Sequence, residues 1–145
     1  MIGLLQRVTH AHVDVDGARV GAIGPGLLVL VGVRKDDAEA DAARLLDRLL
    51  GYRVFPDEQG RMNRSVVDTG GGLLLVPQFT LAADTNKGTR AGFSSAAEPA
   101  RARALFEHLL GLARARLPDT QAGVFGADMQ VGSVNDGPVT FWIES

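Results

Sequence analysis

Residues 73–93, LLLVPQFTLAADTNKGTRAGF, join an apolar run to a polar, glycine-containing segment. The run Leu73–Val76 is continuous rather than alternating, which is typical of a strand that is buried on both faces. Proline is tolerated in sheets at a strand end, edge or bulge, so we expect the strand to leave regular pairing at Pro77. Three residues that follow are the first site candidates: Gln78, Phe79 and Thr80. On this local pattern alone, two strand-end polar residues around a core phenylalanine would be the simpler interpretation.

A second stretch near the C-terminus, NDGPVT at residues 135–140, combines a turn signal with a Gly-Pro pair. Asp136-Gly137 lies between the patterns MQVGSV and VTFWI, so the sequence predicts a tight turn between two strands. Pro138 fixes φ and brings no competing N–H, so the carbonyl oxygens here could accept hydrogen bonds from a ligand's ammonium group. A plain hairpin turn is the alternative.

Composition bounds the class of protein. The chain has 145 residues, of which 46% are apolar and 22% are charged, so we expect one globular domain over residues 1–145 that could bury more surface by oligomerising. It has no cysteine, which excludes disulfides, thiolate nucleophiles and cysteine-ligated zinc, and fits a reducing cytoplasm. No apolar stretch approaches the length of a membrane-spanning helix, and we expect a soluble, cytoplasmic protein.

Charge is distributed unevenly along the chain. The net charge of −2 argues against generic binding to phosphate backbones, so no DNA partner is expected. Residues 87–116 nevertheless carry six basic and two acidic side chains, an excess that could guide a tRNA end. Four of these arginines lie on a predicted helix and are interpreted as a solvated face, whereas Lys87 and Arg90 are predicted RNA contacts. His10 and His12 share a strand face without a third ligand nearby, so no metal site is expected.

Strand patterns occupy most of the chain outside two helical stretches. The sequence predicts strands within residues 2–33, with a turn at Asp16-Gly17, and others at 52–55, 73–76, 121–124, 129–134 and 139–144. Helical spacing predicts one helix through Leu50, capped by Asp36 or Asp37, and one from Pro99 to about Arg116. We therefore expect a mixed α/β fold: a layered, β-rich domain with two helices packed on largely antiparallel sheets.

The stretches QFTLAADTNKG and NDGPVT, in this order and at this spacing, resemble those of the D-aminoacyl-tRNA deacylases. Other segments are similar too, so the resemblance covers practically the whole chain: LLQRVTHAHVDVDG, VGAIGPGLLVLVGV, RMNRSVVD and GVFGADMQVGSVNDGPVT. One position departs, because the family usually carries serine where this chain has Pro77. An animal-type relative with a PQATL-like motif has proline there, but Phe79 and the NDGPVT ending are similar to the main family.

The resemblance implies hydrolysis of the ester between a D-amino acid, or glycine mischarged on tRNA-Ala, and the 3′ end of tRNA. No cofactor is expected. It implies a homodimer in which the Gly-Pro segment of one subunit completes the active site of the other, with Arg7 supporting that segment. The implied catalytic residues are Gln78, Phe79 and Thr80. The implied substrate contacts are Gly137, Pro138, Val139, Thr140, Pro77, Phe125 and Met129.

Several alternatives stay open. Phe125 and Met129 are interpreted as core residues on general grounds, although the resemblance favours a pocket for the 3′-terminal adenosine. Thr80 could be a nucleophile, but a threonine without a neighbouring base is weak, and water attack assisted by the 2′-hydroxyl of the tRNA is preferred. Backbone N–H groups around Gln78 to Thr80 could stabilise the oxyanion. Two other functions remain: an animal-type deacylase acting on L-alanyl-tRNA, and a nucleic-acid-binding module without catalysis.

Overall fold

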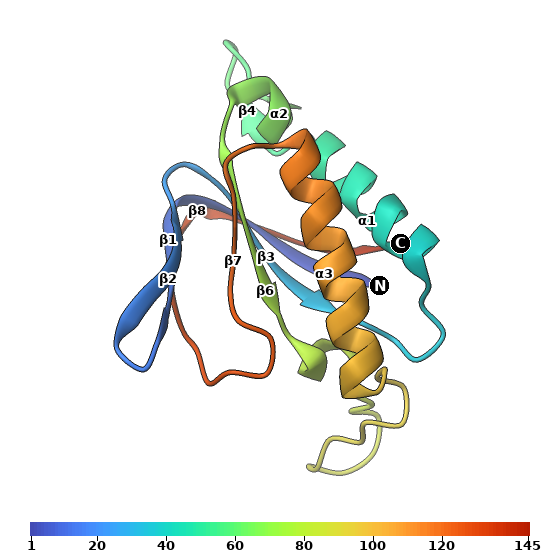
Figure 1. Cartoon of the computed structure of the whole chain (residues 1–145). Helices are drawn as coiled ribbons and strands as arrows, with labels where there is room; N and C mark the ends of the chain where they lie inside the picture. Colours follow the sequence, from blue (N-terminus) through green and yellow to red (C-terminus); the bar gives the residue numbers. More distant parts are fainter.

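The computed structural model describes residues 1–145 and has one curled mixed sheet with helices on one side (Figure 1). The sheet contains six strands: β1 (Ile2–Val15), β2 (Ala18–Ile23), β3 (Gly26–Gly32), β6 (Gly72–Pro77), β7 (Thr120–Ala122) and β8 (Gln130–Glu144). A separate pair consists of β4 (Phe55–Pro56) and β5 (Met62–Arg64). The helical elements are α1 (Glu39–Gly51), α2 (Val66–Thr69), the 3-10 turn η1 (Phe79–Ala82) and α3 (Pro99–Arg116).

Strand β1 organises the sheet because its two halves pair with different strands. On one edge, its first half pairs antiparallel with β3 (Gly3 with Val31) and its second half with β2 (Val13 with Gly21). On the other edge, β8 follows β1 almost from end to end. β6 adds to β3 in parallel, and β7 adds to β6 in the same way. The sheet therefore curls until Gly21 of β2 lies against the backbone of Ala122 in β7.

Strand β6 is buried on both faces, which confirms the prediction from its continuous apolar run. Leu73 and Leu75 belong to the larger hydrophobic cluster, beneath α1 and α3. Leu74 and Val76 belong to a smaller cluster, enclosed by β1 and β2. All four side chains are at most 1% exposed, and full burial of such a side chain contributes about 1.5–3 kcal/mol. The curl of the sheet thus supplies the second layer that a parallel strand needs.

The two long helices cover the same side of the sheet (Figure 1). The buried stripe of α1 consists of Ala42, Leu45, Leu46, Leu49 and Leu50. The buried stripe of α3 consists of Ala102, Leu105, Phe106, Leu109 and Ala113. Both stripes follow the predicted helical spacing. No helix combines the length and the apolarity needed to span a membrane.

The start of α1 differs from the prediction. Its N-cap is Ala38, whose N–H donates to the Asp41 carboxylate at 2.8 Å. Asp37, one of the two predicted capping residues, instead accepts hydrogen bonds from the Met1 ammonium at 2.8 Å and the Arg34 N–H at 2.6 Å. A buried ammonium requires a charged partner. The Asp37 carboxylate therefore binds the Met1 ammonium instead of capping the helix.

The C-terminal strands differ more strongly from the prediction. The predicted hairpin at Asp136-Gly137 is wrong, because residues 130–144 form one strand, β8, and both of its halves pair with β1. The structure also has three helices rather than two, and its β3–β6–β7 portion is parallel within an otherwise antiparallel sheet. Helix α2 and strand β5 form where no regular element was predicted, and the predicted strand at 52–55 is reduced to β4.

Glu144, at the end of β8, links this strand to the segment that follows β3. Its carboxylate accepts hydrogen bonds from Arg34 Nη2 at 2.7 Å and from the Trp142 indole N–H at 2.8 Å. The hydrogen bonds from Arg34 and then Trp142 lower the pKa of Glu144 from 4.5 to about 2. A depressed pKa stabilises the folded state above the unfolded pKa, and this contribution is lost as the pH falls through the folded value.

We expect the free energy of unfolding to fall as the pH is lowered from about 4.5 to about 2, with Glu144 contributing part of the slope. Glu144→Gln should flatten that slope in urea unfolding measured across this window. Because the Glu144 side chain is 46% exposed, solvent screening keeps the contribution small. Glu107→Gln, on the exposed side of α3, is the control. A Glu144→Gln protein with the wild-type slope would contradict the assignment.

Candidate active site

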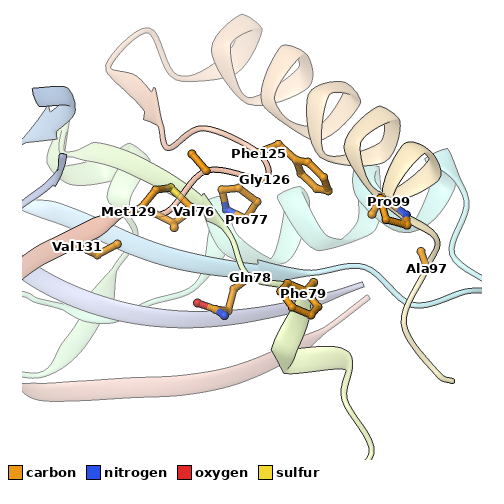
Figure 2. A pocket seen from close by; sticks show the side chains of 12 residues that line it. Val76, Pro77, Gln78, Phe79, Ala97, Pro99, Phe125, Gly126, Met129 and Val131 are labelled. Carbon is orange, nitrogen blue, oxygen red and sulfur yellow. The ribbon is translucent and has the colours of Figure 1, made fainter. Parts of the chain in front are cut away.

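An apolar cavity of about 440 Å³ lies where β6 ends, between the segment that leads to β8 and the first turns of α3 (Figure 2). This volume is within the range of small-molecule pockets. Its walls carry no charged side chain, and they are formed by Val76, Pro77, Gln78, Phe79, Ala97, Pro99, Ala102, Phe125, Gly126, Ala127, Met129 and Val131. A site of this kind suits a flat or apolar group, with Gln78 as its polar side chain.

Pro77 stands where the ladder between β6 and β7 ends, and it lines the cavity. The Leu73 N–H donates to the Asp119 backbone carbonyl, and the Gly123 N–H donates to the Leu75 carbonyl. The backbone groups of the odd-numbered residues of β6 therefore point towards β7. The next donor in this series would be residue 77, and proline has none. On the opposite edge the ladder continues for one more bond, because Gln78 N–H donates to Val31 at 2.7 Å. The prediction that regular pairing ends at Pro77 is confirmed.

The turn η1 directly after Pro77 presents free backbone donors. The first N–H groups of any helix have no internal acceptor. Leu81 N–H donates to the Gln78 carbonyl and closes the turn, while the N–H groups of Phe79 and Thr80 have no backbone acceptor. The N–H of Gln78 is already bound to Val31 and is not available as an oxyanion donor. The predicted set of donors is therefore reduced to Phe79 and Thr80.

The hydroxyl of Thr80 contacts an amide rather than a base. Gln78 Nε2 donates to Thr80 Oγ1 at 2.5 Å, which leaves the hydroxyl proton free to be donated elsewhere. The cavity lining contains no histidine or carboxylate that could remove that proton. Thr80 is exposed and lies at the cavity's edge, one residue beyond Phe79. The arrangement suits hydrogen-bond donation better than nucleophilic attack.

The Gly-Pro segment forms a loop within β8. Val8 pairs with Asn135 and Gln6 pairs with Thr140, so residues 136–139 stand opposite Arg7 alone. The Gly137-Pro138 bond is cis, and Gly137 has φ 124°, a conformation that favours glycine. Both residues are exposed.

Side chains from β1 and β8 hold this loop. Asn135 Oδ1 accepts from Val139 N–H at 3.3 Å, and Asn135 Nδ2 donates to Thr140 Oγ1 at 2.8 Å. Arg7 Nε donates to the Asp136 carbonyl at 3.3 Å, and its Nη1 donates to the Val54 carbonyl at 2.6 Å. The loop is therefore fixed at its base while its tip points into solvent.

Within the chain, the candidate residues fall into two groups. Arg7 stands opposite Leu27 of β3, whereas Gln78 bonds to Val31, four residues further along. Strands β1 and β3 also lie between β8 and β6. At about 3.3 Å per residue and about 4.8 Å per strand, the Gly-Pro loop and η1 are on the order of 20 Å apart. The cavity contains Pro77, Gln78, Phe79, Phe125 and Met129. The remote group contains Arg7, Gly137, Pro138, Val139 and Thr140.

Other predicted residues lie around the cavity. Phe125 and Met129 are half-buried: each packs against a hydrophobic cluster and also lines the cavity (Figure 2). Phe79 is 57% exposed, so the simpler interpretation of it as a core residue is wrong, and it contacts the exposed Phe93 with ring centroids 5.2 Å apart. Lys87 and Arg90 are exposed in the segment between η1 and α3 and do not line the cavity.

About half of the cavity wall is not predicted by the sequence. The missed residues are small or aliphatic and carry no chemical signal: Val76, Ala97, Pro99, Ala102, Gly126, Ala127 and Val131. Pro99 was recognised only as the start of a helix, which it is. Its place in the cavity wall follows from how α3 crosses the sheet, and no local pattern encodes that.

Solved structures first define the class of protein. One described as "c-Myc DNA Unwinding Element Binding Protein" is 38% identical, with a TM-score of 0.95 over 100% of this chain and 99% of that chain. Another, described as a "probable eukaryotic D-amino acid tRNA deacylase", is 16% identical with a TM-score of 0.87 over 99% and 98% of the two chains. The second likeness shows that the chain has the fold of a deacylase.

Sequence comparison then gives the family. The family model described as D-Tyr-tRNA(Tyr) deacylase matches residues 4–144. A D-aminoacyl-tRNA deacylase of Alkalilimnicola ehrlichii is 67% identical over 100% of this chain and 97% of that protein. The chain belongs to the D-Tyr-tRNA(Tyr) deacylase family, as its motifs predict. A deacylase is a hydrolase, so the chain is an enzyme of that class.

We expect Pro77→Ser to be nearly neutral. The restored N–H would face the end of β7, where the ladder already stops, so stability should change by less than about 0.5 kcal/mol. Because the cavity wall keeps its shape, kcat for D-Tyr-tRNA should stay within about threefold of wild type. Thermal unfolding and steady-state hydrolysis measure the two quantities, with Pro118→Ser as the control. A rate change beyond about tenfold would show that residue 77 takes part in the chemistry.

Proposed function

We propose that this enzyme hydrolyses the ester bond of D-aminoacyl-tRNA, releasing the D-amino acid and free tRNA, and rejects L-aminoacyl-tRNA. The observation that carries the proposal is the apolar cavity with the two free N–H groups of Phe79 and Thr80 at its edge. An ester carbonyl placed there would find donors directed at the oxygen that becomes negative. Loss of one such donor typically costs on the order of 10²–10³ in rate.

The cavity is proposed to receive the 3′-terminal nucleoside of the tRNA. Its walls are apolar and include the ring of Phe125, and unpaired bases are commonly held by stacking on aromatic side chains. The adjoining ester would then lie towards η1. Lys87 and Arg90, exposed in the segment after η1, are proposed to contact the RNA backbone that enters the site.

A homodimer is proposed to complete the site. The exposed Gly-Pro loop lies too far from η1 of its own protomer to meet the substrate there. Strand β8 is long, and beyond β1 it has no partner on its outer edge, while Phe141 and Trp142 are 36% and 51% exposed. Such an edge is a template for pairing with another chain. The loop of one protomer is thus proposed to reach the cavity of its partner, where Val139 and Thr140 would flank the substrate.

Chiral selection is proposed to be steric. D and L enantiomers carry the same groups and have the same apolar transfer free energy, so burial alone cannot separate them. A pocket rejects a competitor strongly only by a clash or an unpaired polar group. The Gly137 and Pro138 carbonyls are proposed to hold the substrate ammonium while the loop occupies the space that an L side chain would need. Glycine, which lacks a side chain, would enter, including glycine on tRNA-Ala.

The test is hydrolysis of matched D-Tyr-tRNA and L-Tyr-tRNA by the purified protein in the presence of a chelator. We expect rapid loss of the D-ester alone. Pro138→Ala should raise hydrolysis of the L-ester by roughly 10–200-fold, the range that a missing steric contact supplies. The control is Pro56→Ala, on the separate β4–β5 pair. Full discrimination by Pro138→Ala would overturn the steric filter.

For the chemical step we propose attack by water assisted by the 2′-hydroxyl of the tRNA, with Thr80 as a hydrogen-bond donor. Thr80 contacts the amide of Gln78 and no base. Thr80→Ala should therefore keep activity within roughly tenfold of wild type, whereas substrate lacking the 2′-hydroxyl should not react. Single-turnover rates measure both, with Thr89→Ala as the control. The reverse pattern would make Thr80 the nucleophile.

Two other functions give different results in the same assays. A nucleic-acid-binding module, which the description of one structural neighbour suggests for that neighbour, would bind tRNA or DNA with strong salt dependence and cleave neither ester. The net charge of −2 weighs against it. An animal-type deacylase would hydrolyse L-Ala-tRNA. Because aminoacylated tRNA is used in translation, the cytoplasm is the proposed location.

A further inference from the structure

The aromatic wall of the cavity lies on a segment with little regular structure. Phe125 sits in a turn between β7 and β8, where Ala127 N–H donates to the Val124 carbonyl. The neighbouring support comes from Val124 N–H, which lies 3.4 Å from the Met129 sulfur. Such a turn does not by itself fix the orientation of a large ring. The ring therefore depends on contacts from α3, beside which it lies (Figure 2).

Arg103 of α3 makes those contacts. Its guanidinium carbon is 5.0 Å from the centroid of the Phe125 ring, and its Nη2 is 3.5 Å from the Phe125 carbonyl oxygen. Phe106, one turn further along α3, contacts the same ring with centroids 6.4 Å apart. The ring thus rests on a buried phenylalanine and on an exposed arginine. A planar guanidinium suits this role because it can stack on the ring and donate a hydrogen bond at once.

The other arginines of α3 are engaged differently. Arg101 donates to the Asp37 carbonyl, and Arg116 pairs with Asp47. Arg103 has no carboxylate partner, and it lies next to Ala102, which lines the cavity. Arg103 is exposed, as the interpretation of a solvated face expects, and it also contacts Phe125.

We propose that Arg103 is a positioning residue that holds Phe125 in place as the stacking wall for the 3′-terminal nucleotide of the tRNA. This inference rests on the proposed function, because it assigns that nucleotide to the cavity. Arg103 acts through Phe125, so its removal should weaken binding of the terminal nucleotide and leave the chemical step unchanged. An exposed cation–π contact corresponds to a change of about two- to fivefold in affinity.

The experiment compares wild type, Arg103→Gln, Phe125→Leu and the double variant in hydrolysis of D-Tyr-tRNA. We expect Arg103→Gln to raise KM by about two- to fivefold with kcat unchanged. In the Phe125→Leu background the same substitution should have no further effect on KM. If Arg103→Gln raised KM by the same factor in the wild-type and in the Phe125→Leu protein, Arg103 would contact the RNA directly. That result would overturn the proposal.

Arg114→Gln is the matched control. Arg114 is exposed on the same helix, eleven residues or about three turns from Arg103, so it shares the face but lies about 16 Å away along the axis. The Arg114→Gln substitution removes the same charge and should leave KM unchanged. If Arg114→Gln raises KM as much as Arg103→Gln, general electrostatic attraction explains the effect and the proposal fails.

A binding measurement tests the same point without catalysis. Arg103→Gln should weaken binding of uncharged tRNA by about two- to fivefold, and should not change binding of tRNA trimmed by its 3′-terminal nucleotide. An equal loss for both RNAs would contradict the proposal. If the wild-type protein hydrolysed neither D- nor L-Tyr-tRNA, the proposed function itself would be contradicted. Failure of the Arg103 proposal and failure of the proposed function therefore give different results.

Discussion

The antiparallel ladder between β1 and β8 holds the two ends of the chain together and carries the Gly-Pro loop. Ile2 pairs with Glu144 at one end of this ladder, and Asp14 pairs with Gln130 at the other. The Met1 ammonium lies 2.8 Å from the Asp37 carboxylate and 2.7 Å from Ser145 Oγ, so ionic and polar contacts hold the same end. The loop is an interruption of a long pairing rather than its terminus. It is anchored on both sides by strand hydrogen bonds that form when the protein folds.

This anchoring bears on the proposed separation of enantiomers. A flexible loop could move aside for an L side chain, and the discrimination would then fall to the cost of that movement. Arg7 and Asn135 instead bind the backbone or side chains on both sides of the loop tip. The conformational entropy of the loop is lost on folding and not on binding. Both enantiomers would therefore meet the same fixed backbone.

Local patterns predicted the elements, and long-range pairing determined where they go. The apolar run Leu73–Val76 and the helix stripes identify their elements because burial imposes a period on the sequence. The signal at Asp136-Gly137 predicts a hairpin because turn chemistry is local, whereas the pairing of both halves of β8 with β1 is not local. The assignment of Asp37 failed for the same reason, since Met1 is remote in sequence. Half of the cavity wall consists of residues whose only distinguishing property is position.

The cavity has one feature that bears on the pH dependence of the proposed reaction. None of the residues that line it can ionise near neutral pH, and Thr80 at its edge cannot either. The cavity wall itself therefore supplies no acid or base whose titration would shape a bell-shaped rate profile. The α-amino group of the proposed substrate does ionise near this range. The pH profile of such an enzyme would report the protonation of its substrate rather than its own.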